Sequence, residues 1–236
     1  MNLMMSIGKS GVKGFQNQVN TSAQNIANST TTGFKKQYAE LQELIYYTKP
    51  NMLPSEASTS TNIMQGVGVR ADVIKENNRQ GALTQTGVDT HYAVSGNGYF
   101  AVVDSNTQEI YLTRDGSFSL NEEGTLVDTN GNEVILKTTT DEAGNTIQVP
   151  ALHLPTQPAF LTKLGDNYYS VNPQNLVSNL ETNEGFGQIN SGYLEASNVD
   201  LGEEMTNLMI AQRAYSMNMK IIQTADETRE IVNNLR

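Results

Sequence analysis

The last forty residues, 197–236, read SNVDLGEEMTNLMIAQRAYSMNMKIIQTADETREIVNNLR and decide the fold. The stretch contains no proline, and its single glycine, Gly202, lies near its start. Asn198 or Asp200 can cap a helix here, and acids in the first turn are stabilised by the helix dipole. The sequence therefore predicts one helix of roughly 35 residues, about 50 Å long at 1.5 Å per residue.

Apolar residues recur along this predicted helix in steps of three, four and seven, before the apolar seam shifts around the helix. The first seam contains Leu201, Met205, Leu208, Tyr215, Met219 and Ile222, and the second contains Ile221, Ala225, Val232 and Leu235. A single apolar stripe on so long a helix needs a partner helix, in this chain or in a neighbouring copy. An ordinary surface helix packed on its own domain is the alternative that the pattern leaves open.

Residues 3–27 predict a second amphipathic helix. Its apolar face would contain Leu3, Ile7, Phe15, Val19, Ala23 and Ile26. Each of its glycines, at positions 8, 11 and 14, costs about 1 kcal/mol relative to alanine in a helix interior. We therefore expect this helix to be loose until its apolar face is covered. Residues 1–36 carry four lysines and no acid, whereas 198–236 carry six acids and four basic residues, so packing of the two ends would pair opposite charges.

Between the predicted helices the sequence changes character. Residues 34–48 continue a short periodic pattern that predicts a connecting helix, and Pro50 and Pro54 then begin an extended linker. From residue 69 to about 188, β-rich runs alternate with Asn-Gly and Asp-Gly turns, which strongly indicate hairpins. The sequence thus predicts an α+β fold in which a mainly antiparallel β domain is inserted into a discontinuous N-/C-terminal α-helical coiled-coil domain. The predicted division is 1–35 and 196–236 for the helical domain, 36–68 for the connecting helix and linker, and 69–195 for the β-rich outer domain.

Composition excludes several classes of function. The net charge is −10 at pH 7 and no basic block is present, so we predict no nucleic-acid partner. The chain has no cysteine and therefore no disulfide or zinc–thiolate site. No apolar run is long enough for membrane insertion, and the N-terminus lacks the pattern of a cleavable secretory signal.

Candidate catalytic and ligand-binding motifs lack the surroundings that they need. The Gly-Lys-Ser at 8–10 has Leu3 where a phosphate-binding loop requires glycine. The glycine motif at 96–101 leads into a strand pattern, which indicates a hairpin turn. His91 and His153 are isolated, and no nucleophile, base and oxyanion partner assemble. We therefore predict no catalytic site, no cofactor and no metal site.

Three motifs resemble those of the bacterial flagellar basal-body rod protein family, which includes rod and hook proteins. They are NIANSTTTGFK at 25–35, the β-region segments VSGNGYFAVV, YLTRDGSFSLNEEGTLVDTNG and LGDNYYS between 94 and 170, and LEASNVDLGEEMTNLMIAQRAYSMNMKIIQTADE at 194–227. Serine or threonine replaces the second asparagine of the N-terminal family pattern. The resemblance covers nearly the whole chain. The matched positions singled out are Asn25, Asn28, Gly33, Phe34, Lys35, Ser197, Asn198, Val199, Gln212, Arg213, Ala214 and Tyr215.

The resemblance implies a structural subunit, not an enzyme, located in the flagellum basal body. Such subunits form a helical homopolymer, the hollow shaft that transmits torque from motor to hook. The implied partners are further copies, neighbouring rod and hook proteins and the flagellar type III export apparatus, with bushing rings or peptidoglycan around the rod as further candidates. The segment GVGVR followed by SGNGYF resembles distal rod members most. A proximal rod or hook-type subunit is the first alternative, and a cell-wall-binding β module with a coiled-coil tail is a remoter one.

The apolar faces of the two predicted helices form the predicted assembly interface, within the chain and between subunits. Its residues are Ile7, Phe15, Val19, Ile26, Met205, Leu208, Tyr215, Met219 and Ile222. Burying each such side chain is worth roughly 1.5–3 kcal/mol. A few per subunit, repeated over a lattice, can offset the ordering entropy of loose termini. We expect a monomer with frayed ends in isolation.

Overall fold

The computed structural model describes residues 2–44, 47–49, 63–66, 68–105, 107–140, 146–157, 161–178 and 185–235. Contacts divide the chain into two compact units. Unit 1 consists of Met1–Ala27, Lys36–Asn77 and Val199–Arg236, and unit 2 consists of Asn28–Lys35 and Asn78–Asn198. Two terminal helices with a mainly antiparallel β region between them confirm the predicted α+β class. The predicted domain boundaries at 35, 68 and 195 stay a prediction.

The two long helices form as the sequence predicts. Helix α1 spans Asn2–Ala27 and helix α2 spans Leu201–Asn234. Asp200 is the N-cap of α2, where its carboxylate accepts hydrogen bonds from the Gly202 and Glu203 amides at 2.8 and 3.1 Å. Neither described helix is apolar enough over a sufficient length to cross a membrane.

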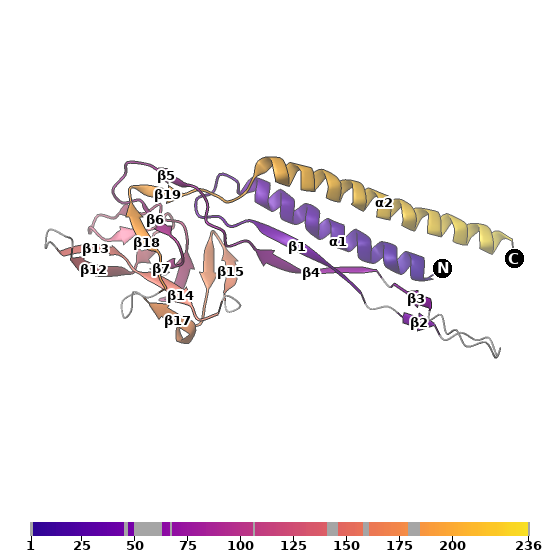
Figure 1. Ribbon diagram of the computed structural model, residues 1–236, viewed down its shortest axis with the longest axis horizontal. Coiled ribbons are helices and arrows are strands. Elements are labelled where there is room, and N and C mark those ends of the chain that lie inside the picture. The colour runs from indigo at the N-terminus through magenta and orange to yellow at the C-terminus, as the bar shows by residue number, and fades with distance from the viewer. Residues whose placement is uncertain are drawn as a thin grey trace. The chain divides into compact units, whose positions relative to one another are not determined.

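Helices α1 and α2 run side by side in opposite directions (Figure 1). Gly8 of α1 lies next to Ile222 of α2, whereas Asn25 contacts Glu204, so the residue numbers run in opposite senses along the pair. The start of α1 and the end of α2 therefore lie at the same end of unit 1.

A two-stranded ribbon completes unit 1 where a connecting helix was expected, and that expectation was wrong. Strand β1, Gln37–Glu43, pairs antiparallel with β4, Val69–Glu76, with a register shift between Glu40 and Gln42. Strands β2, Tyr47–Lys49, and β3, Ile63–Gln65, also pair. The helical period in 34–48 covers few turns, and pairing with a β-branched partner distant in sequence overrides such a weak local pattern. Most of the predicted linker, residues 50–62 and 67, lies outside the described residues.

Polar side chains attach α1 to the backbone of this ribbon. The Val69 amide donates to Ser10 Oγ at 3.3 Å, and Asn17 Nδ2 donates to the Ala71 carbonyl at 2.7 Å. Between them, a Cβ added to Gly14 would lie 2.9 Å from a methyl of Leu41. Glycine therefore allows helix and ribbon to approach closely at this point.

In its described residues, unit 2 is built from antiparallel strands and a short 3₁₀ helix, η2 (Pro173–Asn175). The strands are β5 (Leu83–Gln85), β6 (Tyr92–Ser95), β7 (Tyr99–Val103), β8 (Ile110–Thr113), β9 (Ser119–Leu120), β10 (Leu126–Val127), β11 (Glu133–Val134), β12 (Leu136–Thr140), β13 (Thr146–Pro150), β14 (Leu152–Pro155), β15 (Thr162–Gly165), β16 (Tyr168–Ser170), β17 (Leu176–Ser178), β18 (Gln188–Ser191) and β19 (Tyr193–Glu195). The main sheet has the order β15-β16-β8-β7-β11-β10-β9, with β14 pairing both β7 and β17. Pairs β12–β13, β6–β18 and β5–β19 complete the unit.

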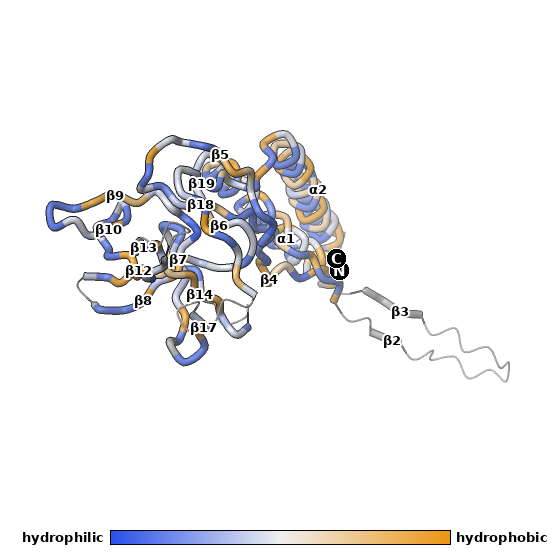
Figure 2. Tube along the Cα trace, turned by 60° about the vertical axis from the view of Figure 1, so that its left-hand side comes forward, coloured by the Kyte–Doolittle hydropathy of each residue, from blue (hydrophilic) through white to orange (hydrophobic). Residues whose placement is uncertain are grey.

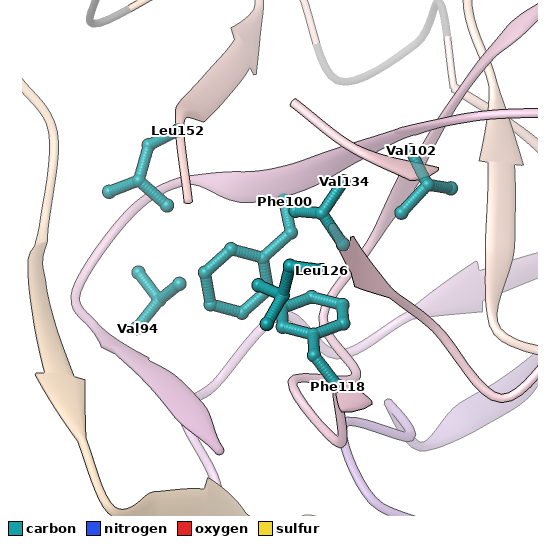
Figure 3. Close-up of a cluster of buried hydrophobic side chains, with 7 residues drawn as sticks. All are labelled: Val94, Phe100, Val102, Phe118, Leu126, Val134 and Leu152. Carbon is teal, nitrogen blue, oxygen red and sulfur yellow. The ribbon is translucent and has the colours of Figure 1, made fainter. Parts of the chain in front are cut away.

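Strand β7 is the centre of the unit 2 core because it buries side chains on both faces. Phe100 and Val102 belong to one buried apolar cluster, and Tyr99 and Ala101 belong to another. Figure 3 shows the first cluster, in which the rings of Phe100 and Phe118 meet edge to face with centroids 5.2 Å apart. The predicted hairpin region therefore folds around the segment SGNGYFAVV. The glycines at 96 and 98 have φ of +108° and +141°. The predicted hairpin at this turn was wrong, because β6 pairs with the distant strand β18 while β7 pairs with β8, β11 and β14.

Candidate assembly site

Helix α2 buries one narrow face. Seven of its eight buried or half-buried residues recur in alternating steps of four and three, and the eighth is Ala214. The seven are Glu204, Leu208, Ala211, Tyr215, Asn218, Ile222 and Ala225. We call this face the α2 seam. The spacing averages 3.5 residues, which is typical of the contact line between two supercoiled helices. The seam is chemically mixed, since it contains a carboxylate, an amide and two alanines as well as large apolar side chains.

Glycines of α1 face the α2 seam and allow close contact. A Cβ added to Gly8 would lie 2.8 Å from Ile222 Cγ1, and one added to Gly11 would lie 2.6 Å from Asn218 Oδ1. Any larger residue at these positions requires the α2 side chain to move. Two of the three glycines that weaken α1 as an isolated helix are therefore contact points in the helix pair.

The predicted apolar interface divides into two groups. The half-buried members are Phe15, Val19, Ile26, Leu208, Tyr215 and Ile222. In contrast, Ile7, Met205 and Met219 are 37%, 52% and 36% exposed. Figure 2 shows that apolar segments, in orange, recur along α2. The helix pair thus covers only part of the apolar surface that the sequence presents.

Asn25, from the N-terminal motif, connects three elements of unit 1. Its Nδ2 donates to the Gln37 carbonyl at 2.6 Å and to Glu204 Oε2 at 3.1 Å, and its Oδ1 accepts from the Gln37 amide at 2.9 Å. The side chain is almost completely buried. Asparagine is the side chain that fits, because the arrangement needs a donor and an acceptor on one short group.

Lys36 forms ion pairs with the first turn of α2. Its Nζ lies 2.9 Å from Glu203 Oε1 and 2.7 Å from Glu204 Oε1. Burial alone would lower the pKa of Lys36, but hydrogen bonds to Glu204 and Glu203 outweigh it and raise this pKa. Burial alone would raise the pKa of Glu204, but hydrogen bonds from Lys36, Asn25 and Ser22 outweigh it and lower that pKa. Both groups are therefore held in their charged forms, and the expected pairing of basic and acidic chain ends is confirmed at this site.

A cleft of about 420 Å³ opens beside this ion pair. Its wall includes Gln18 and Ser22 of α1, Tyr38 and Ala39 of β1, and Ile210 of α2. Tyr38 is 44% exposed and Ile210 is 60% exposed. The cleft is thus a half-open recess with polar groups at its base and apolar side chains at its rim.

Unit 2 contains a second buried charge cluster. Lys35 Nζ lies 2.6 Å from Glu195 Oε1, and both side chains are at most 2% exposed. The lysine also donates to the Arg79 carbonyl at 3.0 Å, and Arg114 approaches Glu195 Oε2 at 3.4 Å. Because an unpaired buried charge is strongly destabilising, these residues depend on one another. The pair joins the N-terminal and C-terminal motifs within one unit.

The remaining N-terminal motif residues have backbone or packing reasons for their identity. Gly33 has φ of +67°, and a Cβ there would lie 2.6 Å from the carbonyl carbon of Arg114. Phe34 is 3% exposed, and its ring lies 4.6 Å from Lys163 Nζ in a cation–π contact. Asn28 Oδ1 accepts a hydrogen bond from Thr31 Oγ1 at 3.3 Å within the turn that follows α1. The motif thus shapes this turn and inserts a side chain into unit 2.

The C-terminal motif residues have different surroundings. Asn198 Nδ2 donates to the Arg79 carbonyl at 2.8 Å, and Ser197 and Val199 beside it are half-buried. Ala214 and Tyr215 are also half-buried, whereas Gln212 and Arg213 are exposed. These last two line an open recess of about 410 Å³ between Met209 and Met217. Half of the Q-R-A-Y motif therefore points away from the rest of its own unit.

Several residues of these clusters were not singled out from the sequence. Glu195, Glu204, Lys36 and Arg114 are buried partners of the motif residues, and only the acid-free N-terminal segment suggested such pairing. The Gly-Lys-Ser segment at 8–10, which lacks the glycine of a phosphate-binding loop, lies inside α1. Burial lowers the pKa of His153. Within the described ranges, no three His, Asp or Glu residues are placed to hold a metal ion.

Comparisons with known proteins match these same regions. A family model described as "Flagella basal body rod protein" matches residues 5–35, and "Flagellar hook protein FlgE/F/G D1 domain" matches 93–171. A third, "Flagellar basal body rod FlgEFG protein C-terminal", matches 190–235. The matched ranges contain the Asn25, Lys35, Glu195 and Glu204 clusters.

Curated relatives extend the similarity over the whole chain. The flagellar basal-body rod protein FlgG of Agrobacterium fabrum is 33% identical over 97% of this chain and 97% of its own length. FlgG of Bacillus subtilis is 32% identical over 97% of each chain, and FlgF of Caulobacter vibrioides is 32% identical over 100% of this chain and 98% of its own. The chain therefore belongs to the family of flagellar basal-body rod proteins, as a FlgG-like member.

Proposed function

We propose that this chain is a structural, non-enzymatic subunit of the bacterial flagellar rod, in its distal part. Copies of the chain assemble into the hollow axial shaft of the basal body and transmit torque from the motor to the hook. The similarity to FlgG proteins over 97% of the chain supports the distal position. The mechanical role requires contacts between subunits, not a catalytic centre.

The observation that carries this proposal is the apolar surface left uncovered on α2. Met205, Met209, Ile210 and Met217 are each more than half exposed. Exposed apolar surface of this extent is unfavourable in a monomer and is typical of an interaction site. In the shaft, further copies of the chain would cover it.

The helix pair supports a coiled-coil interpretation of the chain ends. The α2 seam has the spacing of a coiled coil, and α1 lies along it in the opposite direction. Knobs-into-holes packing of these helices would give the subunit a stiff axial element. The axial domain would contain 1–35 and 196–236, and the outer domain 69–195.

The partners of the proposed subunit follow from its place in the shaft. Neighbouring rod and hook proteins would contact the same helices as further copies do. Export through the flagellar type III apparatus, without a cleaved signal, is consistent with a glycine-rich α1 that becomes ordered on assembly. Bushing rings or peptidoglycan around the rod would face the outer domain.

Electron microscopy of basal bodies from a strain that lacks the gene tests the proposal. We expect a short rod with no hook, and restoration of both by the intact chain. The control is the chain with Met205, Met209 and Met217 each changed to Glu, which should be produced but should not restore the rod. A normal rod and hook in the deletion strain would overturn the proposal.

A proximal position in the rod is the second candidate, and the FlgF relative favours it. That protein is 32% identical over the whole chain, close to the values for FlgG. Immunogold labelling separates the two positions. Label next to the hook supports the distal position, whereas label only at the motor-side end supports the proximal one.

A further inference from the structure

Most of the exposed large apolar residues of α2, together with Leu235 just after it, lie in two separate bands, whereas Ile231 lies between the bands. The Met205 band consists of Leu201, Met205, Met209 and Met219, which are 44%, 52%, 52% and 36% exposed. The Ile221 band consists of Ile210, Met217, Ile221 and Leu235, which are 60%, 66%, 39% and 82% exposed. Successive residues of a helix are turned by about 100°. This rotation places the two bands on opposite sides of the α2 seam, each roughly 100° away from it.

Neither band is covered by another helix of the same chain. Helix α1 contacts the seam at Asn218, Ile222 and Glu204, and the residues of the two bands are each at least 36% exposed. Across the described ranges α1 and α2 are the only α-helices, so these ranges offer no third helix to cover a band. Two apolar strips on opposite sides of one helix indicate a helix that has three neighbours, one of its own chain and two others.

We propose that the Met205 band of one copy packs against the Ile221 band of the next copy. This inference rests on the proposed function, because a helical shaft relates its subunits by rotation and translation. Such an assembly needs heterologous contacts, in which two different surfaces meet. A band that paired with itself would relate two copies by a two-fold axis, so successive copies would point in opposite directions along the proposed shaft, which has a motor end and a hook end. Each copy therefore uses one band for the preceding subunit and the other for the following subunit.

The surroundings of the bands fit this pairing. Ile210 forms part of the rim of the cleft of about 420 Å³, together with Tyr38 of β1. Methionine is flexible, fills irregular gaps and makes favourable contacts with aromatic rings. The Met205 and Met209 side chains of a neighbouring copy are therefore suited to the space beside Ile210 and Tyr38. The contact would seal the cleft and remove apolar surface of both copies from water.

Co-purification of differently tagged full-length chains, expressed together in cells that lack the native gene, tests the inference. One variant carries Met205→Glu with Met209→Glu, and the other carries Met217→Glu with Ile221→Glu. The matched control is Thr206→Glu with Thr224→Glu, because both threonines are exposed on the face opposite the seam. All substituted positions are exposed, so each variant should retain the circular dichroism and thermal unfolding of the wild-type monomer.

We expect each band variant to lose association with a second copy of itself by about tenfold or more, because burying a carboxylate in an apolar contact is costly. The two band variants should still co-purify with each other, since one intact Met205 band and one intact Ile221 band remain. The control should self-associate as the wild type does. Self-association of either band variant at the wild-type level would overturn the pairing of unlike bands. A wild-type chain that does not self-associate at all would instead contradict the proposed function.

Discussion

At the centre of unit 2, Phe100 and Leu152 are completely buried, whereas on α2 of unit 1 Met217 and Ile210 are 66% and 60% exposed. The fully buried positions of α2 are Glu204, Ala211 and Ala225, so unit 1 places small and polar residues where unit 2 places large apolar ones. Unit 2 therefore contains its own apolar core, whereas unit 1 leaves apolar surface of α2 exposed, which further copies would cover in the proposed shaft.

Buried polar groups serve the two units differently. In unit 2 the Lys35–Glu195 pair lies deep among backbone partners and fixes the motif turn. In unit 1 Asn25 and Lys36 meet Glu204 beside an open cleft. Unit 1 therefore combines specific contacts that set the alignment of the helices with an apolar surface that stays available.

The largest effect should come from opening the unit 2 core. Phe100→Ala removes a ring that is completely buried, so we expect a loss of about 3–5 kcal/mol in the free energy of unfolding. Met217→Ala is the matched change in unit 1, and it should alter the stability of the monomer by no more than about 0.5 kcal/mol. Urea denaturation of both variants measures the contrast. Equal losses would mean that α2 is packed as tightly as β7.

Breaking the buried ion pair should be nearly as costly. Lys35→Ala leaves the Glu195 carboxylate buried, with Arg114 at 3.4 Å as its one remaining cationic partner among the described residues, so we expect a loss of about 3 kcal/mol. Lys9→Ala is the control, because Lys9 is an exposed lysine of α1. In the same denaturation experiment, the Lys9 variant should unfold at the wild-type midpoint. A wild-type midpoint for Lys35→Ala would show that the pair does not stabilise unit 2.

A large side chain at Gly8 should destabilise unit 1 and leave the stability of unit 2 unchanged. Gly8→Leu forces a side chain against Ile222, and overpacking of this kind costs about 1–3 kcal/mol. Ala23→Leu adds the same side chain at an exposed position of α1 and should be neutral. Proteolysis followed by mass spectrometry measures the loss of stability at the terminal helices themselves. Unchanged cleavage of α1 and α2 in Gly8→Leu would contradict the close helix contact.

The smallest effect is a dependence on pH. The pKa of Glu204 in the folded chain lies below its ordinary value of 4.5, so the ionised carboxylate stabilises unit 1 above that pH. This contribution is lost as the pH falls through the lowered pKa. Glu204→Gln should therefore reduce stability at pH 7 and leave a weaker dependence on acid. Thermal unfolding of both proteins between pH 3 and pH 7 measures the difference, and parallel curves would exclude a role for this ionisation.

Much of the fold could be predicted from local patterns. The absence of proline and a capping residue at Asn198 or Asp200 predicted α2, and the glycines at 124 and 131 predicted the turns between β9, β10 and β11. Strand β1 could not be predicted, because it forms by pairing with Val69–Glu76 and its own short pattern looks helical. The strand can be recognised only from its pairing with a distant segment of the folded chain.

The contacts of the candidate assembly site could be predicted from the sequence to a smaller extent than the fold. Asn25 and Glu204 are 179 residues apart, and Lys35 and Glu195 are 160 apart, so no local spacing links them. Counting apolar residues also placed Met205 and Ile222 in one stripe, although Ile222 lies on the α2 seam and Met205 is exposed. The difference arises because glycine and alanine, which carry little apolar surface, form part of the contact face.

Hydrogen exchange, followed residue by residue in the isolated monomer and in the assembled shaft, shows most directly whether neighbouring copies complete unit 1. If unit 1 is completed by its neighbours, amides of α2 between Met205 and Ile222 should exchange fast in the monomer and become strongly protected in the shaft. Amides of β7 should be equally protected in both. Protection of α2 in the monomer as strong as that of β7, with no further gain on assembly, would mean that unit 1 is complete without its neighbours.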